Sequence, residues 1–276
     1  MNSTDWQLDW DEAFDNMQGH DQQRLLQSWQ NSSEKFKAKW SFLGELDLDL
    51  VYGKHSREKY DIFKPSRNMK GTVIFIHGGY WMRTGREDWA FLAEGILANN
   101  WAFAIPSYPL APEVRISSIT SSISQAVERI AAVTTGPLKL IGHSAGGHLV
   151  SRLICKKVLG NEILQRIEKA ISVSGIHDLR PLLNTKMNQT LGLTHAEAEK
   201  ESSVFYTPEN IFFTCWVGAN ERPELLRQNR LLQEAWLAHS CSKSQIEACY
   251  DNGHDHFSVI EQLADKHSPL VKLLTN

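Results

Sequence analysis

The sequence predicts an α/β fold, with a mostly parallel central sheet and helices on both of its faces. Short apolar and β-branched segments alternate along the chain with segments whose apolar residues recur every three or four positions. Such alternation is typical of parallel strands joined by right-handed helical crossovers, which cover both faces of a sheet. The 276 residues contain no internal repeat and no linker rich in Pro, Gly or Ser. A single domain over residues 1–276 therefore accounts for the chain.

The composition excludes several classes of protein. The chain has 29 Lys and Arg against 32 Asp and Glu, a formal net charge of −3, which excludes a strongly basic nucleic-acid-binding protein. No apolar run approaches the ~20 residues of a membrane span, and the first residues lack the pattern of a secretory signal. The four cysteines form no CxxC pair and are expected to be reduced. We therefore expect a cytoplasmic protein that binds neither nucleic acid nor a membrane.

The first 42 residues, approximately, are expected to form an N-terminal helical arm. Apolar side chains within residues 10–40 recur at helical spacings of three, four and seven positions. They are Leu25, Leu26, Trp29, Phe36 and Trp40. Packing of this arm on the main body is the favoured interpretation, and a lid over a pocket is the alternative.

The elements of the main body follow in alternation. A half-exposed strand is expected at residues 46–52, where Leu alternates with Asp, and residues 60–63 form its hairpin partner. Further strands are expected at residues 72–76, 101–105, 138–141, 170–173, 211–217 and 245–250, and helices at residues 88–98, 117–133, 146–158, 223–238 and from 258. Residues 176–208 fit neither pattern and could form a small cap; the alternative is that the fold has no cap.

Gly-His-Ser-Ala-Gly, residues 142–146, joins a predicted strand to a predicted helix. A Gly-x-Ser-x-Gly sequence in this position is typical of the nucleophile elbow of the α/β-hydrolase fold, where a strained backbone exposes the serine hydroxyl. Ser144 is therefore the candidate nucleophile. A glycine-rich turn with a solvated serine is the alternative interpretation.

His-Gly-Gly-Tyr-Trp, residues 77–81, follows the strand at residues 72–76. Acyl transfer needs N–H donors directed at the carbonyl oxygen as it becomes negative, and glycines let the backbone approach that oxygen closely. In the α/β-hydrolase fold one donor comes from the loop after this early strand and another from the residue after the nucleophile. We expect the oxyanion hole to consist of N–H groups at Gly78, Gly79 and Ala145.

A serine nucleophile also needs a histidine to take its proton and a carboxylate to orient that histidine. Both follow the serine in this fold, the acid first, on loops after the last strands. Glu221 is the candidate acid. The alternative interpretation is that Glu221 is an ordinary acidic residue stabilised at a helix N-terminus. His254 and His256 are both candidate bases. Asp251 or Asp255 could orient the histidine instead, although both lie close to it in sequence.

The same loop also resembles a metal-binding run, because His254, Asp255 and His256 are consecutive. A zinc site needs three or four ligands at suitable spacing. The sequence has no HExxH motif and no second cluster to supply the others. We therefore expect no metal and no other cofactor.

With these residues in view, the chain resembles the kynurenine formamidase (arylformamidase) group of α/β-hydrolases, which are relatives of the hormone-sensitive-lipase-like esterases. The resemblance spans nearly the whole chain. Its matching segments are residues 52–53, 61–63, 77–81, 111–115, 142–149, 174–181, 223–224 and 255–257. Aromatic residues in His-Gly-Gly-Tyr-Trp replace the last glycine of the wider lipases' His-Gly-Gly-Gly, which favours an aromatic substrate.

The resemblance implies a metal-independent serine hydrolase that cleaves N-formyl-L-kynurenine to L-kynurenine and formate, a step in tryptophan breakdown. It implies Ser144 as the nucleophile and His256, rather than His254, as the base. The family generally has an aspartate in the acid turn, where this chain has Asn220 and Glu221. Glutamate also serves as the acid in this fold, so Glu221 is the expected third residue.

Three residues are candidates for substrate binding. Tyr80 and Trp81 are expected to stack on the aryl ring, and His177 to recognise the amino-acid end of the small-molecule substrate. Two other functions stay open: an esterase or amidase for another small acyl substrate, and a non-catalytic binding protein, which Asn220 suggests. The sequence does not fix the oligomeric state, and a homodimer stays open.

Overall fold

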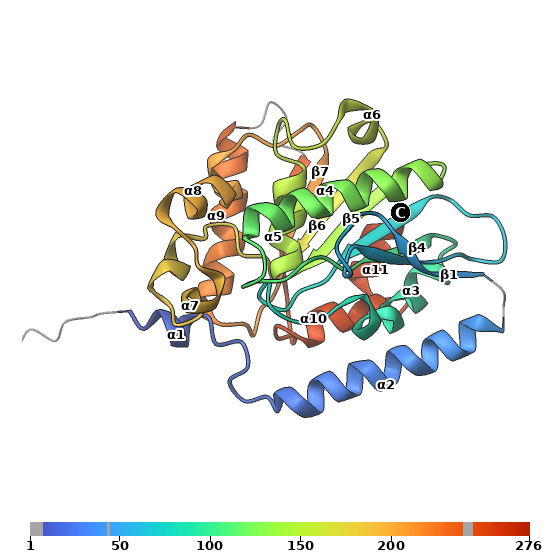
Figure 1. Ribbon diagram of the computed structural model, residues 1–276, viewed down its shortest axis with the longest axis horizontal. Helices are drawn as coiled ribbons and strands as arrows, with labels where there is room; N and C mark the ends of the chain where they lie inside the picture. Colours follow the sequence, from blue (N-terminus) through green and yellow to red (C-terminus); the bar gives the residue numbers. More distant parts are fainter. Residues whose placement is uncertain (1–7, 43–44, 240–244) are drawn as a thin grey trace, which may run out of the picture.

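One sheet forms the centre of the fold (Figure 1). The computed structural model describes residues 8–42, 45–239 and 245–276, and in these residues eight strands lie in the order β1-β2-β4-β3-β5-β6-β7-β8. Their bounds are β1 Leu46–Val51, β2 Lys59–Phe63, β3 Thr72–Ile76, β4 Ala102–Pro106, β5 Leu138–His143, β6 Ile167–Val173, β7 Phe212–Gly218 and β8 Ile246–Asp251. β2 is antiparallel to β1 and β4, and the other neighbours are parallel. The predicted mostly parallel sheet is confirmed.

Helices cover both faces of this sheet (Figure 1). Their bounds are α1 Trp10–Ala13, α2 Gln22–Ser41, α3 Ala93–Leu97, α4 Ile116–Val133, α5 Ala145–Leu153, α6 Asn161–Leu164, α7 Asn188–Leu191, α8 His195–Glu201, α9 Pro223–His239, α10 Ser258–Glu261 and α11 Pro269–Thr275. Successive residues of a strand face opposite sides. Ile74 and Ile76 of β3 join the apolar cluster of α4, α5 and α9. Val73 and Phe75 join that of α2, α3 and α11, so β3 is apolar throughout.

The N-terminal arm differs from the continuous pattern expected over residues 10–40, because it forms two helices. Each begins at an aspartate whose side chain accepts a backbone N–H: Asp9 from Glu12 at 3.1 Å and Asp21 from Arg24 at 3.1 Å. Between the two helices Gly19 has a φ of +85°, which interrupts helical geometry. The apolar spacing predicted α2 but not the turn before it. Residues 1–7 of the predicted arm lie outside the described residues.

Helix α2 packs on the main body through aromatic and polar contacts. The Trp29 ring lies 4.4 Å from that of Trp89, centroid to centroid, and Trp29 Nε1 donates to Glu261 Oε1 at 2.7 Å. Lys37 Nζ lies 3.4 Å from Asp61 Oδ2. Helix α2 therefore packs on the main body, as the favoured interpretation of the arm predicts.

Two other segments differ from expectation. Residues 176–208 form short helices, α7 and α8 with 3-10 turns at Arg180–Asn184 and Ser203–Phe205, and the helix expected at residues 88–98 is a 3-10 turn followed by α3. Of the described helices, none is long and apolar enough to cross a membrane. The cysteines at 155, 215 and 249 are free thiols, and Cys241 lies outside the described residues.

We predict that Trp29→Ala lowers the free energy of unfolding by about 3 kcal/mol, because it empties a buried site and removes a hydrogen bond. Urea unfolding measures the change. Phe42→Ala, at the end of the same helix, is the control: its side chain is 90% exposed, and we expect a change below about 0.5 kcal/mol. Similar small changes in both variants would show that α2 adds little stability.

Candidate active site

Ser144 lies in a sharp turn between β5 and α5. Its backbone has φ 55° and ψ −117°, a region that non-glycine residues enter at a cost of about 1–3 kcal/mol. A Cβ at position 142 would lie 2.1 Å from the carbonyl oxygen of Gly146, and one at position 146 would lie 1.9 Å from that of Ile76. Only glycine fits at these two positions. The turn thus has the geometry of a nucleophile elbow.

His256 and Glu221 meet at the carboxyl edge of the sheet. Glu221 follows β7, His256 follows β8, and His256 Nδ1 donates to Glu221 Oε2 at 2.7 Å. Glu221 Oε1 accepts hydrogen bonds from the N–H of Gly218, at 2.9 Å, and from Ser174 Oγ. Both carboxylate oxygens are thus held in place. Because Nδ1 carries the proton, Nε2 of His256 is the free acceptor.

The other two acids of this region have different partners, and His254, the other candidate base, does not line the cavity at Ser144. Asp251 Oδ2 accepts from Trp216 Nε1 at 3.1 Å, and Asp255 Oδ1 accepts from the N–H of Ser258 at 2.8 Å. Among the described residues, Glu221 alone forms a carboxylate contact with His256. That part of the chain contains no group of three His, Cys, Asp or Glu side chains placed to hold a metal.

Ser144 and His256 line the same cavity, but the expected hydrogen bond between them is not formed. In the described part of the chain, His256 Nε2 instead lies 3.3 Å from Asn16 Nδ2, which comes from the segment between α1 and α2. Serine–histidine contacts are often long before substrate binds. The structure therefore brings the three predicted side chains together and adds a fourth, Asn16.

The loop after β3 approaches Ser144 closely at Gly78 and folds tightly on itself at Gly79. A Cβ at Gly78 would lie 3.1 Å from Ser144 Cβ, and one at Gly79, whose φ is +109°, would lie 2.3 Å from the carbonyl oxygen of Arg83. Within the described residues, the N–H groups of Gly78, Gly79 and Ala145 donate to no backbone oxygen. These donors are free for a substrate oxygen, and the predicted oxyanion hole stays a prediction compatible with this geometry.

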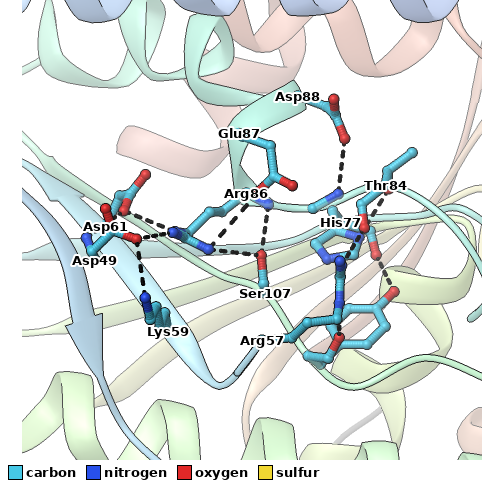
Figure 2. Close-up of polar contacts among 12 residues, drawn as sticks. Asp49, Arg57, Lys59, Asp61, His77, Thr84, Arg86, Glu87, Asp88 and Ser107 are labelled. Carbon is cyan, nitrogen blue, oxygen red and sulfur yellow. Dashed lines mark hydrogen bonds and ion pairs between the residues drawn. The ribbon is translucent and has the colours of Figure 1, made fainter. Parts of the chain in front are cut away.

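A network of hydrogen bonds fixes that loop. The Gly78 carbonyl accepts from His77 Nδ1 and from Thr84 Oγ1, both at 2.8 Å. Arg57 Nη2 donates to the Thr84 carbonyl at 2.5 Å, and Arg57 Nε donates to the Tyr108 carbonyl at 2.9 Å. Figure 2 shows Arg57 beside Thr84 and His77. The guanidinium thus joins the oxyanion loop to the end of β4.

A second arginine continues the network toward the edge of the sheet (Figure 2). The backbone N–H of Arg86 donates to Ser107 Oγ at 2.8 Å, and its Nε donates to the buried Asp61 at 2.9 Å. Asp49 also accepts from Arg86 and lies 3.7 Å from Lys59. A buried carboxylate needs such pairing, so Arg86 and Asp61 hold each other and the end of the loop.

Two histidines beside the site are neutral. Burial lowers the pKa of His77 to about 3 and lowers the pKa of His143 well below its ordinary value. His143 Nε2 donates to the backbone carbonyl of His256 at 2.8 Å, and the two rings lie 4.7 Å apart, centroid to centroid. His143 therefore holds the His256 backbone without adding a charge beside its ring.

The three candidate substrate contacts have different environments. Tyr80 lines the cavity, and its hydroxyl donates to the Phe14 carbonyl at 3.1 Å. Trp81 is fully buried and its Nε1 donates to His148 Nδ1 at 3.3 Å, so it does not reach the cavity. His177 is also fully buried, 3.0 Å from Ser151 Oγ. The expected substrate contacts of Trp81 and His177 are therefore not supported, because both rings are part of the core.

The cavity at Ser144 has a volume of about 60 Å³, well below the roughly 300 Å³ of sites that enclose a larger ligand. Its lining is mainly apolar and aromatic, and the N-terminal arm supplies part of it. The lining includes Met17, Leu25, Leu26, Trp29, Gly79, Tyr80, Trp89, Ser144, His256 and Phe257. The arm thus covers the site, while the described turns of residues 176–208 do not line it.

The sequence did not predict three side chains that contribute to the site. Asn16 has no motif around it. Ser174, with a φ of 54°, donates to Glu221, and residues 174–181 of the family resemblance include it without giving it a role. His143 lies inside the elbow sequence, where its role depends on a carbonyl 113 positions away.

We predict that His148 makes stability fall on acidification. Burial lowers its pKa to about 3 in the folded protein, against about 6.5 when unfolded. Between these values the unfolded state binds the extra proton, so stability declines below pH 6.5, by roughly 1.4 kcal/mol per pH unit. His148→Gln should reduce the slope by that amount, as measured by urea unfolding at pH 7.5, 6 and 5. An unchanged slope would contradict the assignment.

Comparisons with known proteins identify the family. The BD-FAE family model matches residues 60–208, more than half of the chain. Kynurenine formamidase from Danio rerio is 30% identical over 82% of this chain and 80% of that protein, and the one from Salmo salar is 29% identical over 84% and 82%.

Solved structures agree on the fold. A protein from Silicibacter sp. that carries a provisional thioesterase name has a TM-score of 0.91 and 39% identity, over 98% of this chain and 100% of that one. Esterase B from Lactobacillus rhamnosis, with a TM-score of 0.66 and 15% identity over 89% and 92%, shows the fold alone. By identity and coverage, the chain is a hydrolase and belongs to the kynurenine formamidase family of α/β-hydrolases.

Proposed function

We propose that the protein hydrolyses N-formyl-L-kynurenine to L-kynurenine and formate, in the breakdown of tryptophan. The observation that carries the proposal is the 30% identity to a kynurenine formamidase over 82% of the chain. The cavity supports the acyl half of the proposal, because its volume of about 60 Å³ suits a formyl group but does not enclose the kynurenine part of the substrate.

The first half of the reaction transfers the formyl group to the enzyme. Nε2 of His256 takes the proton of Ser144 as Oγ attacks the formyl carbon, and Glu221 stabilises the resulting imidazolium. N–H groups of the oxyanion loop and of Ala145 bind the carbonyl oxygen as it becomes negative. His256 then donates its proton to the aniline nitrogen, the C–N bond breaks and kynurenine leaves.

The second half releases formate. Water attacks the formyl ester of Ser144 while His256 Nε2 takes a proton from the water. The tetrahedral intermediate collapses, His256 returns the proton to Ser144 Oγ, and formate departs. The Glu221 carboxylate at Nδ1 stabilises the imidazolium of His256 in both halves of the reaction, because the imidazole becomes charged once in each.

Hydrolysis of a small ester or thioester is the second candidate. The 39%-identical Silicibacter sp. protein carries a provisional thioesterase name. The same serine, histidine and oxyanion loop would act on such a substrate, since the triad does not select the leaving group.

We predict that kcat/KM for N-formyl-L-kynurenine exceeds that for short-chain aryl esters and thioesters. Product kynurenine is followed by its absorbance, and the esters by release of the phenol or thiol. Ser144→Ala removes the nucleophile and should abolish turnover of every substrate. Efficient ester or thioester hydrolysis with no action on formylkynurenine would replace the proposed function with the second candidate.

We predict that Glu221→Gln lowers kcat by about 10²–10⁴-fold, because a neutral amide cannot stabilise the imidazolium or fix its tautomer. Asp251→Asn is the control, since its carboxylate contacts Trp216 rather than His256, and we expect less than a threefold change, about 0.6 kcal/mol. A mild loss at Glu221 with a severe one at Asp251 would reassign the acid.

A further inference from the structure

Asn16 occupies an unusual place for a residue from the N-terminal arm. It is 5% exposed and lies at the catalytic imidazole, with its Nδ2 3.3 Å from His256 Nε2. Its backbone N–H donates to the Tyr80 hydroxyl at 3.4 Å, and that hydroxyl donates to the Phe14 carbonyl. The segment is thus attached to the loop that carries the expected oxyanion donors.

The orientation of the Asn16 amide follows from the hydrogen bonds of the imidazole. Glu221 accepts at Nδ1, so His256 Nε2 is an acceptor and the atom facing it must be a donor, which is Nδ2 of Asn16. Oδ1 of Asn16 is then left buried, and no described residue donates to it. Eleven other buried side-chain atoms of the described residues also lack a partner, but this one lies at the catalytic base.

The same segment is held from its other side. Arg222, next to Glu221, donates from Nη2 to the Glu12 carbonyl at 2.9 Å and lies 3.1 Å from the Glu12 carboxylate. The backbone N–H of Lys186 donates to Asp11 Oδ1 at 2.6 Å. Asn16 is therefore positioned between the turn of the acid and the oxyanion loop.

We propose that Oδ1 of Asn16 accepts the N–H of the scissile amide during acylation and makes the enzyme selective for amides over esters. This inference rests on the proposed function and adds a specificity-determining residue to it. To receive the proton of His256, the leaving nitrogen must direct its lone pair at Nε2, which turns its N–H toward a neighbouring position. An acceptor beside the imidazole stabilises that arrangement. An ester oxygen has no such hydrogen.

The contact between Asn16 Nδ2 and His256 Nε2 is exchanged when the reaction proceeds. Nε2 must accept the proton of Ser144, so it gives up the amide donor. The released side chain turns its Oδ1 toward the substrate nitrogen. Both hydrogen-bonding atoms of Asn16 therefore have a use, one before and one after the substrate arrives.

The test compares 4-nitroformanilide with 4-nitrophenyl formate, which differ in N–H against O at the leaving atom. The readout is the ratio of kcat/KM for the amide to kcat/KM for the ester. Asn16→Ala should lower this ratio about tenfold, the effect of one hydrogen bond made in the transition state. Asn16→Asp keeps an acceptor oxygen and should hold the ratio within about threefold of wild type. Retained ester hydrolysis shows that each variant is folded.

Met17→Ala is the matched control, because Met17 lines the same cavity from the same segment but offers no amide oxygen to the leaving atom. It should change both rate constants by the same factor. An equal loss for amide and ester in Asn16→Ala, or a gain in both, would overturn this inference and leave the proposed function intact. A wild-type enzyme that hydrolyses the ester but neither 4-nitroformanilide nor formylkynurenine would overturn the two together.

Discussion

The hydrogen bond from His256 Nδ1 to Glu221 Oε2 is the contact on which the rest of the site depends. It fixes the proton on Nδ1 and leaves Nε2 as the acceptor that faces the cavity. The parallel pairing of β7 and β8, which sets Gly218 opposite Asp251, brings the two loops together. The second carboxylate oxygen of Glu221 accepts hydrogen bonds from the Gly218 N–H and from Ser174. The orientation of the base is thus set by strand register and by backbone as much as by the acid.

Around this contact the buried histidines are neutral and two arginines bind polar groups behind the oxyanion loop, while a third, Arg83, lines the cavity itself. His77 and His143 are kept neutral by burial, and both donate to carbonyl oxygens. Arg57 binds carbonyls behind the oxyanion loop, and Arg86 is paired with Asp61 (Figure 2). An oxyanion in the cavity would therefore be stabilised by fixed backbone dipoles in a water-poor site, where such dipoles act most strongly.

The parts of the molecule that local sequence determines could be predicted, and the parts that depend on distant contacts could not. The strand β3 and the turn at Ser144 follow from apolar runs and from glycines with no room for a Cβ. Trp81 and His177 have residue types suited to substrate binding, but only the packed structure shows that they are buried. Asn16 contacts His256, which lies 240 positions away in the sequence. No pattern in the residues around Asn16 predicts that contact.

The two halves of the N-terminal arm are held with different strength, and this bears on Asn16. Helix α2 is held by the buried Trp29, packed on Trp89, whereas the segment around α1 is held by the buried Phe14 and by partly exposed ion pairs of about 1 kcal/mol or less. Segments with few buried contacts open at lower free energy than the core. Asn16 is therefore carried by the more easily displaced half, which suits a side chain that must exchange one hydrogen-bond partner for another in each turnover.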